Sequence, residues 1–199
     1  MSLATGHCNS LHSPSTLPPV PLEHALLVSL SERPASGLEL ARRFERSIGF
    51  FWHATHQQIY RVLGRMDAAG WVDVEEVAQT GRPDKKVYAV SPAGAQALAD
   101  WLATPTPLEP LRSELAVKMR GASRGDSSAV LVVVRANLAE HRARLSHYES
   151  LADRDYPDPD SLTGQALDTY LVLRGGIRVE EFWVAWLEEY LTAHEKDAR

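Results

Sequence analysis

Residues 55–69 restrict the possible folds of this chain most strongly, because they form a predicted short helix with two unlike faces. Ile59, Leu63 and Met66 recur at helical spacing and are expected to face a core. The side chains expected to point outward are those of Thr55, His56, Gln57, Tyr60, Arg61 and Arg65. Such hydrogen-bonding, aromatic and cationic groups can read base edges and bind phosphates in a DNA major groove. An ordinary amphipathic surface helix would show the same face, so the residues that follow must decide between the two interpretations.

The stretch after this helix alternates apolar and polar residues on both sides of a turn. Residues 71–77 and 85–90 alternate, and residues 79–84 supply the glycine and proline between them. The pattern predicts a β-hairpin, whose end carries Arg82, Pro83, Lys85 and Lys86. A cationic hairpin directly after a polar-faced helix is typical of a winged helix-turn-helix, in which the helix enters the major groove and the wing lies along the neighbouring backbone. A charged, solvated turn with no DNA contact is the alternative.

Gln58 also belongs to the predicted DNA-binding residues, although its position suggests a second task. Thr55 and Gln58 have the spacing of a capping box, in which the two side chains bond to each other's backbone N–H at a helix start. The Gln58 amide is therefore expected to be engaged at the end of the helix.

The rest of the first half is expected to form helices that pack against the predicted DNA-binding helix and hairpin. Helices are expected over residues 22–30 and from a second capping box at Ser36 and Glu39, with a buried stripe made by Leu38, Ala41, Phe44 and Ile48. Aromatic residues 50–52 are expected to fill the core, and Pro92 is expected to open a helix that ends before residue 104. The sequence thus predicts a flexible tail over residues 1–20 and a DNA-binding domain over residues 21–103.

The second half predicts a helical domain over residues 111–199, joined by a proline-rich linker at residues 104–110. It begins with a short helix at 111–119, followed by long helices at about 126–152 and 162–193 that prolines at 157 and 159 keep apart. The first long helix has a coiled-coil-like seam that includes His141, interpreted as a hydrogen-bonded core histidine; a pH switch or ligand contact is the alternative. The fold class expected is mainly α with a small β-hairpin.

The last helix carries two adjacent apolar seams, and one protomer needs only one of them. The other is expected to pair with a second copy of the chain, whereas a closed bundle would bury both. Trp183, Trp186 and Tyr190 lie on the second seam. They are candidate effector-binding residues, with a packed interface as the alternative.

Composition excludes several classes of function. The net charge of −5 argues against broad nonspecific nucleic-acid binding but leaves room for a local basic surface. Cys8 is the one cysteine, so no intramolecular disulfide and no metal-cluster spacing is expected, even with His7 and His12 nearby. No export signal or membrane span is found, which predicts a cytoplasmic protein. No catalytic motif is present, so neither an enzyme nor a cofactor is expected.

From Leu22 to Trp101, and less sharply to the C-terminus, the chain resembles PadR-family transcriptional regulators of the long form. The motifs that carry the resemblance are Gln58-Ile-Tyr60 with Leu63 and Met66, Ala69-Gly70-Trp71-Val72, Gly81-Arg-Pro83 with Lys86-Val-Tyr88, and Ser91-Pro-Ala-Gly94. The resemblance implies a winged-helix homodimer that binds double-stranded DNA at a palindromic operator, usually as a repressor, and that a small, often aromatic, effector releases. It also implies that Tyr60 and the start of its helix face DNA and that Arg82 and Lys86 belong to the wing.

The chain departs from the family pattern at three positions, which affects the operator sequence expected. The family often has tyrosine, glycine and proline where this chain has Leu38, Gln57 and Arg61. The leading hypothesis is sequence-specific repression through a dimer. The alternative is a winged-helix module for protein–protein interaction that binds no operator, and the salt dependence of DNA binding separates the two.

Overall fold

The computed structural model describes residues 22–45, 54–78, 85–108 and 111–197. These residues form two compact units, with the main division between Ala103 and Thr104. The expected tail, Cys8 with its neighbouring histidines, Ile48, the aromatic residues 50–52 and the hairpin tip with Arg82 and Pro83 lie outside the described residues. Within the described ranges, no helix is long and apolar enough to cross a bilayer.

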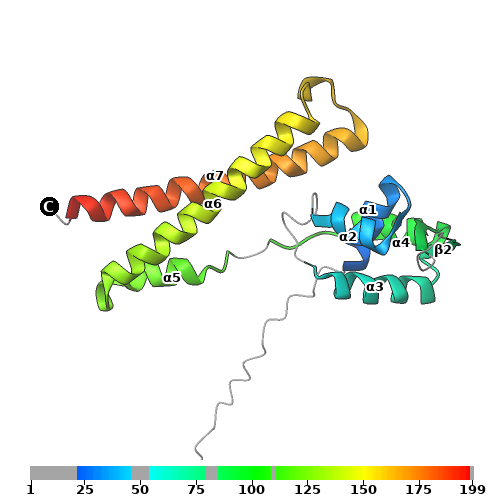
Figure 1. Cartoon of the computed structure of the whole chain (residues 1–199), viewed down its shortest axis with the longest axis horizontal. Helices are drawn as coiled ribbons and strands as arrows, with labels where there is room; N and C mark the ends of the chain where they lie inside the picture. The colour runs from blue at the N-terminus through cyan, green and yellow to red at the C-terminus, as the bar shows by residue number, and fades with distance from the viewer. Residues whose placement is uncertain (1–21, 46–53, 79–84, 109–110, 198–199) are drawn as a thin grey trace, which may run out of the picture. The chain divides into compact units, whose positions relative to one another are not determined.

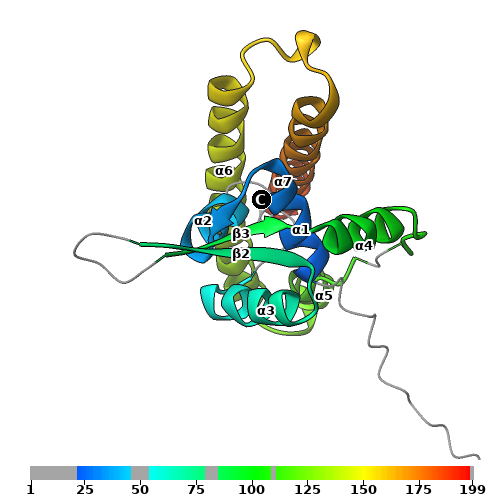
Figure 2. The ribbon, with the colours of Figure 1, turned by 90° about the vertical axis from the view of Figure 1, so that its right-hand side faces the viewer.

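The described residues of the first unit form four helices and a small antiparallel sheet (Figures 1 and 2). The helices are α1 (Leu22–Glu32), α2 (Gly37–Glu45), α3 (His56–Ala68) and α4 (Pro92–Leu102). The strands are β1 (Ala35–Ser36), β2 (Val72–Val77) and β3 (Lys85–Val90), in the order β1-β3-β2. The predicted helix followed by a hairpin is confirmed, and β1 adds a third strand whose Ala35 and Ser36 pair with Tyr88 and Val87.

The apolar stripe of α3 anchors this unit. Ile59, Leu63 and Met66 are buried as their spacing predicts, and Leu26 and Leu27 of α1 are fully buried as well. Because these side chains leave water together, α3 is held by one face and its other face stays free. The first unit therefore presents one side of α3 to solvent.

The predicted buried stripe of α2 was wrong at one position. Leu38 is 42% exposed, whereas Leu40, Ala41 and Phe44 are buried. Oε2 of Glu39 accepts from the N–H and hydroxyl of Ser36, and the Ser36 hydroxyl accepts from the N–H of Glu39, so the predicted capping box is present. With α2 starting at Gly37, residue 40 falls on the same face as residue 44, and residue 38 turns outward.

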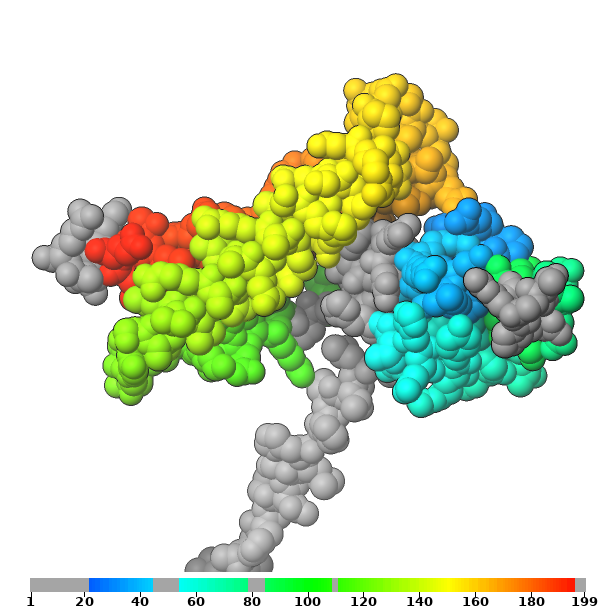
Figure 3. Space-filling model, viewed as in Figure 1, coloured from blue at the N-terminus to red at the C-terminus, as the bar shows by residue number. Residues whose placement is uncertain are grey.

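The described residues of the second unit form three α-helices: α5 (Glu114–Gly121), α6 (Ser127–Asp155) and α7 (Gly164–Asp197), with short 3-10 turns at Ala122–Arg124 and Pro159–Ser161. The long helices run antiparallel as a hairpin, and in the space-filling view their side chains lie against each other where they cross (Figures 1 and 3). The short helix begins at 114 rather than 111, because the Ser113 hydroxyl accepts from the N–H of Ala116 and caps it there.

Two apolar clusters stabilise the second unit. One joins α5 to the long helices through Met119, Val134, Leu138, Leu187 and Leu191, and the other comprises Tyr148, Leu151, Leu173 and Ile177. The predicted seams supply most of these residues, namely Val134, Leu138 and Tyr148 on α6 and Leu173, Ile177, Leu187 and Leu191 on α7, whereas Leu151 lay outside them. The predicted fold class, mainly helical with a winged-helix first half and a helical second half, is confirmed.

A buried carboxylate, which the apolar pattern did not predict, also lies on the long helices. Glu180 of α7 is 7% exposed, and its Oε2 lies 2.5 Å from Nδ1 of His141 while its Oε1 accepts from Nε of Arg144 at 3.1 Å. Nδ1 of His141 also lies 2.8 Å from Nη2 of Arg144, so the three side chains form one polar cluster around the carboxylate. The interpretation of His141 as a hydrogen-bonded core histidine agrees with this geometry.

Candidate nucleic-acid interface

A capping box sets the start of α3, as its sequence predicts. The N–H of Gln58 donates to the Thr55 hydroxyl at 3.2 Å, and the N–H of Thr55 donates to Oε1 of Gln58 at 2.8 Å. Both side chains are exposed but occupied at the helix end. The cap leaves the following residues to form the outward surface of the helix.

The outer face of α3 gathers the other predicted DNA-contacting residues of this helix. His56, Gln57, Arg61 and Arg65 are exposed, and Tyr60 keeps 49% of its surface exposed despite its size. Gln57, Arg61 and Arg65 follow one another at steps of four, so they form a row along the helix. One amide, one aromatic ring and two guanidinium groups thus share a surface that faces water.

The two arginines of this row differ in their surroundings. Arg65 forms an ion pair with Glu23 of α1. Among the ion pairs and hydrogen bonds found in the described ranges, none involves Arg61. A guanidinium carries five donors in a planar fork, which matches the acceptor edge of a guanine or two phosphate oxygens. Within the described part of the chain, the donors of Arg61 are therefore open to a ligand.

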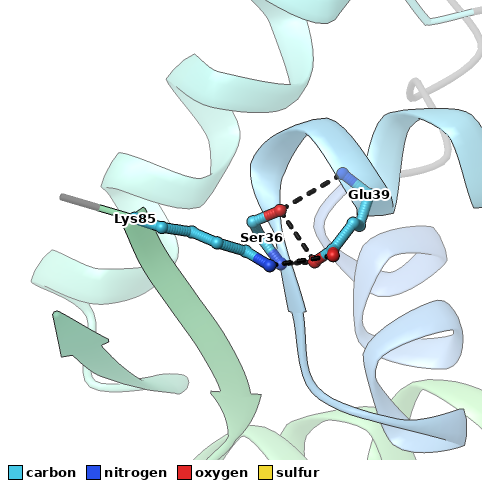
Figure 4. A network of polar contacts seen from close by, with 3 residues as sticks. All are labelled: Ser36, Glu39 and Lys85. Atoms are coloured by element: carbon cyan, nitrogen blue, oxygen red, sulfur yellow. Dashed lines mark hydrogen bonds and ion pairs between the residues drawn. The ribbon is translucent and has the colours of Figure 1, made fainter. Parts of the chain in front are cut away.

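The hairpin contributes two lysines at the base of the wing. Nζ of Lys85 lies 2.8 Å from Oε1 of Glu39, and Nζ of Lys86 lies 3.5 Å from Oε1 of Glu76. Figure 4 shows the Lys85 side chain reaching from β3 to Glu39 and Ser36 at the start of α2. Lys85 thus ties the wing to α2, whereas Lys86 sits in an open, exposed pair. The sequence predicted both lysines for DNA and missed the carboxylates that hold them.

The Glu39 carboxylate is strongly stabilised in its charged form. The hydrogen bond from Lys85, followed by the bonds from the N–H and hydroxyl of Ser36, lowers the pKa of Glu39 from 4.5 to about 2. Donors aimed at a carboxylate favour its ionised state. The ion pair that joins the wing to α2 is therefore complete throughout the neutral pH range.

Two of the candidate effector residues, Trp183 and Trp186, lie in an aromatic cluster on α7. Trp183 stacks on His141 with ring centroids 5.1 Å apart, and Phe182 stacks on Trp186 at 5.8 Å. The hydroxyl of Tyr190 donates to the backbone oxygen of Met119 at 3.0 Å. The two tryptophan rings contact each other with centroids 5.3 Å apart, whereas the Tyr190 ring packs against His194.

A shallow groove of about 400 Å³ lies elsewhere on the second unit, between α6 and α7. Arg135 and Arg142 lie along one side, Glu188 and Thr192 along the other, and the buried residues Leu138 and Leu191 also line it. Arg142 pairs with Glu188 across it at 2.5 Å. Nothing in the sequence pattern singled out this groove, because its walls come from two helices about fifty residues apart.

The described part of the chain contains no group of three or more histidine, cysteine, aspartate or glutamate residues placed to hold a metal ion. The polar chemistry of the first unit instead comes from a helix face and a hairpin, which suits a surface ligand with many acceptors. A nucleic-acid duplex offers such acceptors in its phosphates and base edges.

Comparison with known proteins divides the chain in the same two parts. The model described as the transcriptional regulator PadR-like family matches residues 26–100, and the model described as virulence activator alpha C-term matches residues 111–195. The probable transcriptional regulator Rv1176c of Mycobacterium tuberculosis is 50% identical, with the match covering 86% of this chain and 96% of that protein. The negative transcriptional regulator PadR of Bacillus subtilis is 29% identical over 88% of this chain and 98% of its own length.

Solved structures show the same fold. Bacillus subtilis PadR in complex with operator DNA superposes with a TM-score of 0.77 at 28% identity, covering 86% of this chain and 98% of that one. The Vibrio cholerae virulence activator AphA superposes with a TM-score of 0.73 at 30% identity, covering 88% and 98%. PadR has also been solved with p-coumaric acid, at a TM-score of 0.70 and 27% identity over 86% and 97% of the two chains.

Proposed function

This chain belongs to the PadR-like family of transcriptional regulators, and we propose that it represses transcription as a homodimer bound to an inverted-repeat operator. The observation that carries the proposal is the outer face of α3, where Tyr60 and Arg61 are exposed beside the cationic base of the wing. Two such reading heads, related by a two-fold axis, would match the two halves of a palindrome.

The proposed contacts divide between bases and phosphates. Gln57, Tyr60 and Arg61 lie on the outer face of α3 that would enter the major groove, where Arg61 can bind a guanine or a phosphate pair. Thr55 and Gln58 stand at the helix start and His56 beside them, so backbone phosphates are their natural partners. The neighbouring backbone would be contacted by the end of α3 and the wing, through Arg65, Arg82, Pro83, Lys85 and Lys86. Each lysine that neutralises a phosphate would release a counterion.

The proposed domains follow from this division of labour. Residues 21–103 would bind DNA, residues 104–110 would link the halves, and residues 111–199 would form the dimer and receive the effector. The relatives support this order of parts, because PadR of Bacillus subtilis, which matches over nearly its full length, was solved on operator DNA.

The apolar surface of α7 supports a dimer. Leu171, Val172, Val179 and Phe182 are large apolar residues that the described residues of a single chain leave exposed. They recur at helical spacing, so they form one continuous stripe that a second copy of the same stripe would cover. Val179→Glu should place a charge in that interface and give a folded monomer in sedimentation, whereas Glu195→Gln, on another side of the same helix, should leave the dimer intact.

Repression rather than activation is the proposed sign, by analogy with the relative named a negative regulator. AphA is named an activator, so the sign has its own test. The protein added to a transcription reaction on its own promoter should lower the transcript yield; a rise would reverse the sign and leave operator binding intact.

Relief by a small aromatic effector is the remaining part of the proposal. Trp183 and Trp186 lie in the aromatic cluster of α7, close to the stripe proposed for the dimer, and Tyr190 follows one turn further along the helix. A ligand that parted these rings would change the spacing of the two DNA-binding domains. p-Coumaric acid, which PadR of Bacillus subtilis binds in its solved complex, is the first probe. It should weaken operator binding by the wild type and have less effect on Trp186→Ala; equal release from both proteins would exclude Trp186.

The decisive experiment lets the protein choose its own site from a random-sequence duplex library. Repeated selection should enrich an inverted repeat whose half-sites are about one helical turn apart, or a multiple of it. No enrichment, with no retention of duplex even at low salt, would favour the protein-interaction module. Enrichment of a single half-site with one protomer per duplex would remove the dimer from the account.

A further inference from the structure

Gly37, the first residue of α2, lies directly beneath an aromatic ring from α3. A Cβ atom placed on Gly37 would stand 2.3 Å from Cε1, 2.8 Å from Cζ and 3.0 Å from Cδ1 of Tyr60. Side-chain carbons in proteins do not approach one another this closely. The edge of the Tyr60 ring therefore occupies the space in which any other residue at position 37 would carry its side chain.

Backbone conformation does not explain the glycine at this position. In the described ranges the glycines with positive φ are Gly70 and Gly164, so Gly37 has a backbone that other residues adopt freely. A glycine in a helix also costs stability relative to alanine. The ring of Tyr60 is the feature of the structure that excludes a side chain there.

The start of α2 is held firmly beneath the ring. Ser36 and Glu39 close the capping box around Gly37 with bonds of 2.8, 2.9 and 3.3 Å, and Lys85 anchors Glu39 from the wing. The Tyr60 ring, by contrast, is the far end of a side chain with two rotatable bonds and is half exposed. A methyl group at position 37 would therefore move the ring and leave the backbone in place.

We propose that Gly37 is a positioning residue for DNA recognition, which sets the direction in which Tyr60 leaves α3 by giving the ring a bare backbone to lie on. The inference rests on the proposed function, because Tyr60 matters here only as a DNA contact. It assigns to α2 a part in recognition that requires no contact between Gly37 and DNA. It also explains how a ring that is half exposed is kept in one orientation before DNA arrives, which lowers the entropy lost on binding.

A double-mutant cycle tests the proposal on the duplex that the wild-type protein selects. Gly37→Ala should lower the affinity about tenfold, the equivalent of one good contact, with an unfolding midpoint close to that of the wild type. In a Tyr60→Ala background, Gly37→Ala should have no further effect, since the ring is gone. Gly121→Ala is the matched control, because a Cβ there meets nothing within 4 Å, and it should bind as the wild type does.

The outcomes separate the two hypotheses. Wild-type affinity in Gly37→Ala would overturn the positioning role, and so would an equal loss in the presence and absence of the Tyr60 ring. If Gly37→Ala fails to fold while the Gly37→Ala, Tyr60→Ala double variant folds, the contact is confirmed as a steric one, and failure of both variants to fold would assign Gly37 to stability instead. Failure of the wild type to select any duplex would refute the proposed function itself, and the positioning role with it.

Discussion

Nζ of Lys85 lies 2.8 Å from Oε1 of Glu39, so an ion pair joins the base of the wing to the first turn of α2. The same carboxylate closes the capping box with Ser36 (Figure 4). One side chain thus fixes two elements that must keep their positions relative to α3. The interface is held together by polar contacts at its edge as well as by the apolar core beneath it.

Glu39→Gln should destabilise the first unit by about 1 kcal/mol at pH 7. The loss is small for an ion pair because Lys85 and Glu39 are partly exposed, so water and salt screen their attraction. Since the pKa of Glu39 falls from 4.5 to about 2 on folding, its charge stabilises the fold fully above pH 4.5. That contribution declines as the pH drops from 4.5 toward 2. Urea unfolding at several pH values should show the wild type and variant converging in this window.

Glu75→Gln provides the control for this measurement. Glu75 is exposed on β2, and no ion pair within the described residues involves it. Its neutralisation should change the unfolding free energy little at any pH. A gap between wild type and Glu39→Gln that stays constant from pH 7 to pH 3 would show that the carboxylate does not act through its charge.

Gly94→Ala should destabilise the first unit by about 2 kcal/mol or more. A Cβ on Gly94 would stand 2.0 Å from the backbone oxygen of Trp71, which cannot swing away as a side chain can. Gly64→Ala is the matched control, since a Cβ there meets nothing within 4 Å and alanine favours a helix by about 0.5–1 kcal/mol. Thermal unfolding should rank Gly64→Ala at or above the wild type and Gly94→Ala well below; similar midpoints for all three would refute the close contact.

Glu180→Ala should cost about 3 kcal/mol of stability in the helical unit, because it leaves His141 and Arg144 without their buried partner. Its neighbour Glu181 pairs with Arg178 on the surface, so Glu181→Ala should stay within about 0.5 kcal/mol of the wild type. Denaturant unfolding must be compared at one protein concentration, as a dimer gains stability with concentration. Equal effects of the two substitutions would contradict a structural role for the buried cluster.

Lys86→Ala should make DNA binding less dependent on salt. A lysine that neutralises one phosphate contributes about 0.9 to the slope of log affinity against log salt concentration. The exposed ion pair between Lys86 and Glu76 is too weak to prevent Lys86 from binding a phosphate. Lys118→Ala removes a lysine from a comparable exposed pair in the helical unit and should leave the slope unchanged. A slope identical in Lys86→Ala and the wild type would remove the wing from the DNA contact.

The sequence predicted the parts of the fold that depend on local signals. Capping boxes at Ser36 and Thr55 and the cap at Ser91 mark the starts of three helices, and alternation around a turn predicted the hairpin. β1 escaped notice because a two-residue strand has no periodicity to detect. Leu38 was wrongly predicted to be buried because Leu38 and Leu40 lie close together on α2 and either could belong to its apolar face. Only the packing of α2 in three dimensions shows that Leu40 is the buried one.

The candidate interface was predicted residue by residue but without its supports. The carboxylates of Glu39 and Glu23 meet their partners across 46 and 42 residues of sequence. In the helical unit, Glu180 likewise meets its partners across 36 to 39 residues. Periodicity reports which face a residue occupies, and it carries no information on which remote charge will stand opposite. The same limit applies to the contact between Gly37 and Tyr60, which joins two helices and becomes visible only in three dimensions.

The most direct test of the account is the affinity of Arg61→Ala for the duplex that the wild type selects. Arg61 is exposed on the row of α3 that would face the groove, and its loss should lower affinity tenfold to a hundredfold, about 1–3 kcal/mol, while the protein stays folded. Arg124→Ala, an exposed arginine of the helical unit, is the control and should bind normally. Unchanged affinity in Arg61→Ala would contradict the assignment of α3 as the recognition helix.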